Sequence, residues 1–110
     1  MTIFRATALG AAMFVILASG AAADDTGLAS MHDLRKEGGR TCMTSHAHSG
    51  AGVGRTKPAA MKAALQSWYE YTAWEYGTVW ARWAKSAAKR VSYTKEPDGW
   101  AASVESRPCR

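Results

Sequence analysis

The residues best suited to chemistry lie within one short segment. From Cys42 to His48 the chain reads Cys-Met-Thr-Ser-His-Ala-His, which brings a thiol, a thioether and two imidazoles close together. Sulfur and imidazole nitrogen are donors that suit copper or zinc. Two histidines separated by one residue can both reach one ion from an extended segment. The spacing therefore predicts a candidate metal site at His46 and His48.

That candidate site needs further ligands, because a closed site has about four. His32, Met43 or an acidic residue could complete it, whereas Cys42 is a ligand only while its thiol is free. The alternative interpretation is a solvated polar loop beside a structural disulfide. Both interpretations stay open here, and no cofactor is assigned.

Cys42 and Cys109 are the only cysteines of the chain. In an oxidising compartment they are expected to pair, and a small domain gains much from one covalent link. We therefore predict a disulfide between Cys42 and Cys109, with two free thiols or intermolecular pairing through Cys109 as the alternatives.

The first 23 residues are typical of a cleavable signal peptide. Arg5 precedes an apolar run, and small residues ending in Ala23 come directly before Asp24. The run is shorter than the roughly 20 residues that span a bilayer, so no membrane span is expected after cleavage, although an uncleaved anchor is the alternative. This pattern predicts export to the periplasm or the extracellular space.

Charge narrows the classes of partner. The formal net charge is +5, of which Arg5 leaves with the signal peptide. A basic exported domain suits anionic envelope components or an acidic protein. Nucleic acid is not expected as a partner, because the protein is predicted to be exported and no nucleic-acid recognition motif occurs in the sequence.

Catalytic signals are weak. No serine lies in a nucleophile elbow, Cys42 is expected to be bridged, and Glu70 and Glu75 have no identified partner at working spacing. We therefore expect no enzyme, with an unrecognised enzyme kept as an alternative.

The elements that must position these residues divide the chain after residue 56. Residues 24–56 are glycine-rich and predict an irregular N-terminal segment, whereas residues 57–110 predict a helix plus a hairpin. Thr56 can cap a helix over 57–76, Pro58 fits its first turn, and Gly77 ends it.

The hairpin turns at residues 96–99, which read Glu-Pro-Asp-Gly, between strands of about 91–95 and 100–105. Lys95 should then face Trp100, Tyr93 should face Ala102, and Val91 should face Val104. Residues 78–90 fit either a helix or a third strand. The predicted fold is α+β, with one amphipathic helix packed on a C-terminal antiparallel hairpin or small three-stranded sheet, stapled by one disulfide.

Aromatic and basic residues crowd into the middle of the chain and suggest a binding surface. Trp68 and Trp83 are expected in the core, whereas Tyr69 lies off the apolar stripe of the helix. A solvated helical face and a fully covered aromatic cluster are the alternatives. The candidate surface residues are Trp74, Trp80, Arg82, Lys85, Lys89 and Arg90.

Residues 57–110 also resemble small uncharacterised exported proteins of alphaproteobacteria. The resemblance rests on Ala64, Trp68, Tyr76-Gly77, Trp80, Trp83-Ala84, Trp100-x-Ala102 and the tail Arg107-Pro108-Cys109-Arg110. Such proteins often carry cysteines where this chain has Tyr93 and Ala102, so the resemblance implies the hairpin and favours a third strand, with that extra bridge absent here. It implies no activity.

Together these patterns predict a non-enzymatic exported small basic protein, a binding or structural component of the cell envelope or secreted fraction. The alternative is a small periplasmic metal-binding protein that uses His46 and His48.

Overall fold

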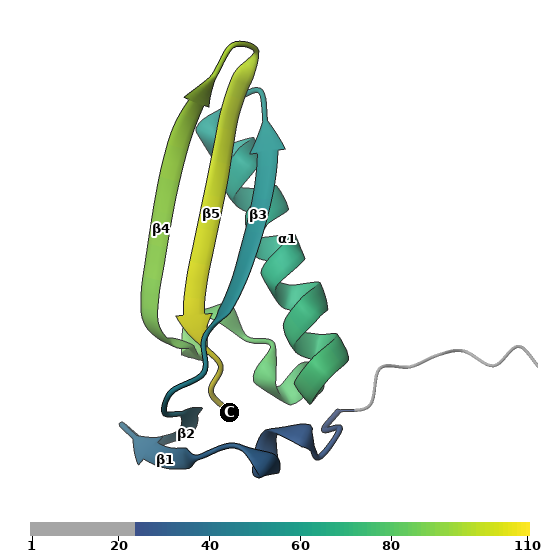
Figure 1. The fold of residues 1–110 in the computed structure, drawn as a ribbon, viewed down its shortest axis with the longest axis vertical. Helices are drawn as coiled ribbons and strands as arrows, with labels where there is room; N and C mark the ends of the chain where they lie inside the picture. The colour runs from purple at the N-terminus through teal and green to yellow at the C-terminus, as the bar shows by residue number, and fades with distance from the viewer. Residues whose placement is uncertain (1–23) are drawn as a thin grey trace, which may run out of the picture.

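The computed structural model describes residues 24–110, so the predicted signal peptide lies outside the described residues. In this part of the chain one α-helix packs on a small antiparallel sheet, and a second, two-stranded sheet lies near one end of the helix (Figure 1). The elements in chain order are η1 (Leu28–Met31), β1 (Leu34–Glu37), β2 (Arg40–Met43), β3 (His48–Gly54), α1 (Lys57–Tyr76), η2 (Thr78–Trp80), η3 (Trp83–Lys85), β4 (Ala87–Glu96) and β5 (Gly99–Arg107). The predicted α+β fold is confirmed.

Helix α1 has the predicted bounds. The side chain of Thr56 accepts a hydrogen bond from the backbone N–H of Ala59 at 3.2 Å, which satisfies one free donor of the first turn. Gly77 follows the helix with φ of 105°, a conformation that only glycine adopts easily. Both ends are therefore set by local sequence. No helix of residues 24–110 is long and apolar enough to cross a membrane.

The C-terminal hairpin also forms as predicted. β4 pairs with β5 so that Lys95 faces Trp100, Tyr93 faces Ala102 and Val91 faces Val104. Both strands extend further than expected. The sheet has the order β3-β5-β4, with all neighbours antiparallel (Figure 1).

The third strand is β3 and comes from the glycine-rich segment, so the prediction that residues 24–56 are irregular is wrong for its strands. A Cβ atom built on Gly50 would lie 2.3 Å from the carbonyl oxygen of Ala64, and one on Gly52 would lie 2.4 Å from the amide nitrogen of Ala64. The glycines are needed because the backbone of α1 lies directly against β3. Residues 78–90 form neither a continuous helix nor the third strand; they form η2, η3 and the start of β4.

Among residues 24–110, two larger apolar clusters fill the space between the elements, beside a small one of Cys42, Ala87 and Cys109. Trp68 is fully buried in the first, between α1 and β5, and Trp83 meets its ring edge-on. The second lies at the C-terminal end of α1, and Trp80 is 1% exposed within it. The prediction that Trp80 lies on a binding surface is therefore wrong, because the turn at Gly77 directs it inward. Its neighbours in the second cluster are Ala29, Met43 and Tyr76.

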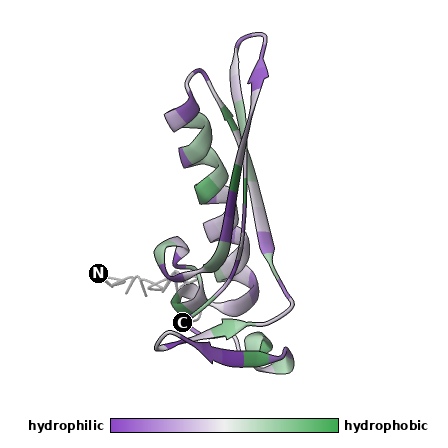
Figure 2. Cartoon of the chain, turned by 90° about the vertical axis from the view of Figure 1, so that its left-hand side faces the viewer, coloured by the Kyte–Doolittle hydropathy of each residue, from purple (hydrophilic) through white to green (hydrophobic). Residues whose placement is uncertain are grey.

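The β1–β2 hairpin lies across one end of α1 and the three-stranded sheet (Figure 2). The predicted disulfide between Cys42 and Cys109 is present and joins β2 to the chain end. Arg107 adds a two-pronged ion pair to Glu37, with N–O distances of 2.8 and 3.0 Å. These links fix residues 34–43 against the sheet.

Candidate metal centre

All three histidines of the chain meet beside one carboxylate of α1. His32 follows η1, His46 lies in the link between β2 and β3, and His48 is the first residue of β3. Glu75 is in the last turn of α1. Four ligand-type side chains from four segments therefore converge, and His46 and His48 are brought together as the sequence predicts.

The distances within this cluster suit closure on one ion. Ligand atoms of His32, His46 and Glu75 lie within 4.8 Å of one another. Nε2 of His46 is 3.9 Å from Oε1 of Glu75, and Nε2 of His48 is 3.7 Å from Oε2. Nitrogen and oxygen ligands bind zinc at about 2.0–2.2 Å, which allows at most about 4.4 Å between two ligands of one ion. Small side-chain movements would bring the ligand atoms of His32, His46 and Glu75 into that range, and His48 approaches the same carboxylate from β3.

His48 is the most constrained member of the cluster. It is 1% exposed, and its Nδ1 lies 2.9 Å from the hydroxyl of Thr72, which is also buried. Its Nε2 has no hydrogen-bond partner among residues 24–110. When Nδ1 donates to Thr72, Nε2 presents its lone pair toward Glu75. A buried nitrogen without a partner is costly in an apolar setting, and a metal ion would satisfy it.

The electrostatics of the cluster favour the protonation states that bind metal. Burial lowers the pKa of His48 to about 4, so its imidazole is neutral at neutral pH. Burial alone would raise the pKa of Glu75, but hydrogen bonds from Tyr71 and Tyr76 outweigh it and lower that pKa. A neutral imidazole beside an ionised carboxylate is the combination that metal binding requires.

Aromatic rings hold the imidazoles in place. The ring of Tyr76 stacks on His48 at 4.8 Å between centroids with a 14° interplanar angle, and Tyr71 covers His48 at 4.4 Å. The hydroxyl of Tyr76 is 3.1 Å from Nε2 of His32. Burial and the hydrogen bond to Glu75 raise the pKa of Tyr76, so it stays a neutral phenol. Rotation of His48 is thereby restricted.

The other sequence candidates do not join this cluster. Cys42 is bonded to Cys109, and Met43 is buried in the second apolar cluster. Sequence reasoning left Glu75 without a partner, and that interpretation is wrong. The missing information was the position of β3, which carries His48 to the end of α1.

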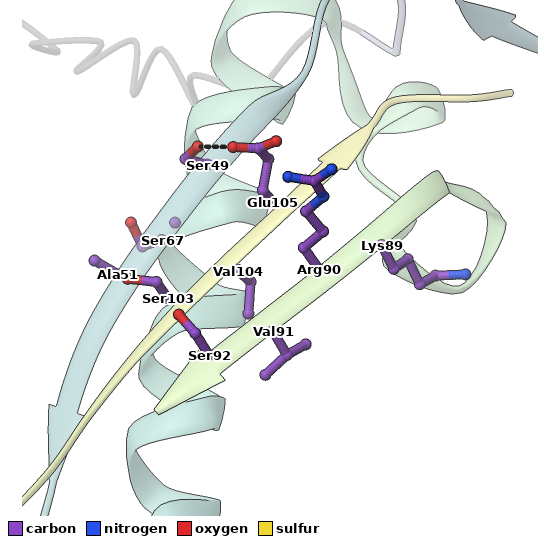
Figure 3. A pocket seen from close by; sticks show the side chains of 11 residues that line it. Ser49, Ala51, Ser67, Lys89, Arg90, Val91, Ser92, Ser103, Val104 and Glu105 are labelled. Atoms are coloured by element: carbon purple, nitrogen blue, oxygen red, sulfur yellow. Dashed lines mark hydrogen bonds between the residues drawn. The ribbon is translucent and has the colours of Figure 1, made fainter. Parts of the chain in front are cut away.

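The candidate surface residues are spread over several elements. Trp74 on α1 is 76% exposed, and four basic side chains of η3, β4 and the residues before them are exposed: Arg82, Lys85, Lys89 and Arg90. Lys89 and Arg90 line a pocket of about 1020 Å³ with small residues of β3 and β5 (Figure 3). Glu105 lies in the same pocket and is 3.5 Å from the hydroxyl of Ser49. This surface is polar and mainly cationic.

Comparison of the chain with protein-family models, with curated proteins and with solved structures finds no match.

Proposed function

We propose that this is an exported small protein that binds one copper or zinc ion through His32, His46, His48 and Glu75. The single observation that supports this most directly is the buried Nε2 of His48, which lies 3.7 Å from Glu75 and has no hydrogen-bond partner in the part of the chain that the structure describes. Two further histidines converge on the same carboxylate. Three imidazoles with one carboxylate suit copper and zinc better than calcium or magnesium, which prefer oxygen ligands.

The proposed role is binding rather than catalysis. The side chains of the cluster are of the types that bind metal. A threonine orients His48, and two tyrosine rings cover it. The Cys42–Cys109 disulfide and the signal-like N-terminus support a location in the periplasm or outside the cell.

The test is titration of residues 24–110, stripped of metal with a chelator, with Cu²⁺ and Zn²⁺ in separate experiments. We expect one ion per chain with a dissociation constant below about 1 μM. The double variant His46→Ala/His48→Ala should lose this binding, and Glu75→Gln should weaken it at least tenfold. Glu70→Gln is the matched control, because Glu70 is an exposed carboxylate of the same helix, away from the histidines, and accepts a hydrogen bond from Gln66.

Because His48 is buried, its replacement could unfold the chain. His32→Ala and His46→Ala change half-buried side chains instead, and circular dichroism reports whether the fold persists. Folded variants that bind as tightly as the parent protein, or a parent protein with no saturable uptake of either ion, would overturn the proposal.

A second candidate function is contact with an anionic envelope component. The exposed side chains of Arg82, Lys85 and Arg90 have no acidic side chain within 4.0 Å among residues 24–110. Unpaired surface cations attract polyanions in a salt-dependent way. Retention on a column of immobilised polyanion that salt abolishes, and that charge removal at these three residues weakens, would support it.

A further inference from the structure

A groove of about 670 Å³ runs along α1 on the side that faces Tyr93 of β4. Lys57, Met61, Leu65 and Tyr69 recur at every fourth position of α1 and form one of its walls. At 1.5 Å per residue this stripe is about 18 Å long. The far wall includes Trp83 and Tyr93. The groove is therefore long and mainly apolar.

The groove exists because α1 covers only part of the sheet. The glycines of β3 bring α1 over β3 and β5, and the helix does not extend over β4 (Figure 1). Val91 and Tyr93 point to the helix side of β4 by their register with Val104 and Ala102, yet they are 43% and 40% exposed. Because no helix covers β4, these apolar side chains are exposed to solvent.

One end of the groove is positively charged. Lys57 and Lys62 line it at the N-terminal end of α1, where the helix dipole is also positive. The ammonium of Lys57 lies 4.5 Å from the ring centroid of Trp100 and 5.4 Å from that of Tyr93. No acidic side chain of residues 24–110 lies within 4.0 Å of either lysine. An anion placed here would meet two unpaired cations.

We propose that this groove binds a free fatty acid, with the carboxylate at Lys57 and Lys62 and the hydrocarbon chain along Met61, Leu65 and Trp83. The hydrocarbon core of a bilayer is about 30 Å thick, so one extended acyl chain spans about 15 Å, which matches the stripe on α1. Burying the chain provides most of the affinity, and the lysines select an anionic head over a neutral one. This site is separate from the histidine cluster and does not depend on metal.

The experiment measures binding of dodecanoate and of dodecanol, both below their aggregation concentrations, by isothermal titration and by tryptophan emission. Dodecanoate should bind one molecule per chain, and dodecanol, with the same chain and no charge, should bind at least tenfold more weakly. Lys57→Met/Lys62→Met keeps the apolar stems and should weaken dodecanoate tenfold or more. The matched control Lys36→Met/Lys89→Met removes two exposed lysines outside the groove and should change affinity less than twofold.

A third variant probes the apolar wall: Tyr93→Ser should weaken both ligands equally, because it removes contact with the chain and not with the head. Equal binding of dodecanoate and dodecanol, or an equal effect of the two lysine pairs, would overturn the proposal in favour of unspecific apolar binding. Binding to phosphatidylglycerol vesicles without binding of dodecanoate would overturn it in favour of a membrane surface. Absence of dodecanoate binding would also overturn it.

Discussion

The molecule has two regions that are held together by different means. In the helix–sheet layer, formed by α1, β3, β4 and β5, the backbone of α1 contacts β3 through glycines and buried side chains fill the interface. In the base, residues 24–47 with residues 108–110, the strands β1 and β2 have only four residues each, and only Cys42 and Met43 of them are buried. The second apolar cluster buries Ala29 and Met43 of the base, and single links add to it, namely the disulfide and three arginine–carboxylate pairs, at Glu37 and at Asp25.

The histidine cluster lies at the boundary between these two regions. His32 and His46 belong to the base, whereas His48 and Glu75 belong to the helix–sheet layer. A bound ion would add one more link between the base and the helix–sheet layer. In the base we therefore expect stability to depend on individual side-chain links. In the helix–sheet layer we expect it to depend on close packing of the helix on the strands.

The largest effect should come from removing the disulfide with Cys42→Ala/Cys109→Ala. The two cysteines are 67 residues apart, and closing a loop of that length stabilises a protein by about 4 kcal/mol in the loop-entropy model. That is comparable to the whole stability of many domains of this size. Chemical denaturation of the oxidised parent and of the variant measures the loss. A loss below about 1 kcal/mol would mean that the base does not depend on its covalent link.

The next largest effect should come from Gly52→Val, which adds a side chain between β3 and α1. The new Cβ would meet the amide nitrogen of Ala64 at 2.4 Å, so α1 would have to move away from β3. We expect a loss of about 3 kcal/mol. Ala51→Val is the matched control, since Ala51 is the exposed neighbour on the opposite face of β3. Similar losses for both variants would contradict the close packing of helix on strand.

Local signals in the sequence predicted the parts of the fold that depend on neighbouring residues. The ends of α1 follow from Thr56 and Gly77, and the hairpin register follows from the turn at residues 96–99. β3 was missed because alternating glycines are typical of loops. Their purpose appears only once α1 is placed on the strand, and that contact joins residues that are distant in sequence.

The candidate site was predictable only in part for the same reason. The spacing of His46 and His48 indicated a metal site, and His32 was one of the possible completions. Nothing in the sequence singled out Glu75 among the acidic residues, because its role depends on where β3 begins. Trp80 was misplaced because a pattern of tryptophans and cations does not reveal the turn after α1.

A smaller and pH-dependent effect should come from the ion pair of the base. The hydrogen bond from Arg107, helped by Arg35, lowers the pKa of Glu37 to about 2 from its ordinary 4.5. Below pH 4.5 the unfolded state binds a proton that the folded state does not, so this stabilisation is present above pH 4.5 and is lost as the pH falls toward 2.

Glu37→Gln should therefore be less stable than the parent at pH 7 and equally stable near pH 2. Urea denaturation at several pH values measures the difference. Glu105→Gln, at an exposed carboxylate of β5, should leave the acid limb of the profile in place. An unchanged acid limb in Glu37→Gln would show that another group causes it.

The smallest effect should come from the first residues of β4. Ala88 has φ of 54° at a register shift between Ala87 and Arg90. A Cβ in this left-handed conformation costs about 1 kcal/mol, and glycine avoids that cost but loses more entropy on folding. Ala88→Gly should therefore raise the free energy of unfolding by up to about 0.5 kcal/mol, seen as a higher urea midpoint with an unchanged slope. Ala101→Gly, within β5, should lower it. A loss of equal size in both variants would mean that residue 88 adopts an ordinary strand conformation in solution, and that β4 pairs with β5 from Ala87 onward without a bulge.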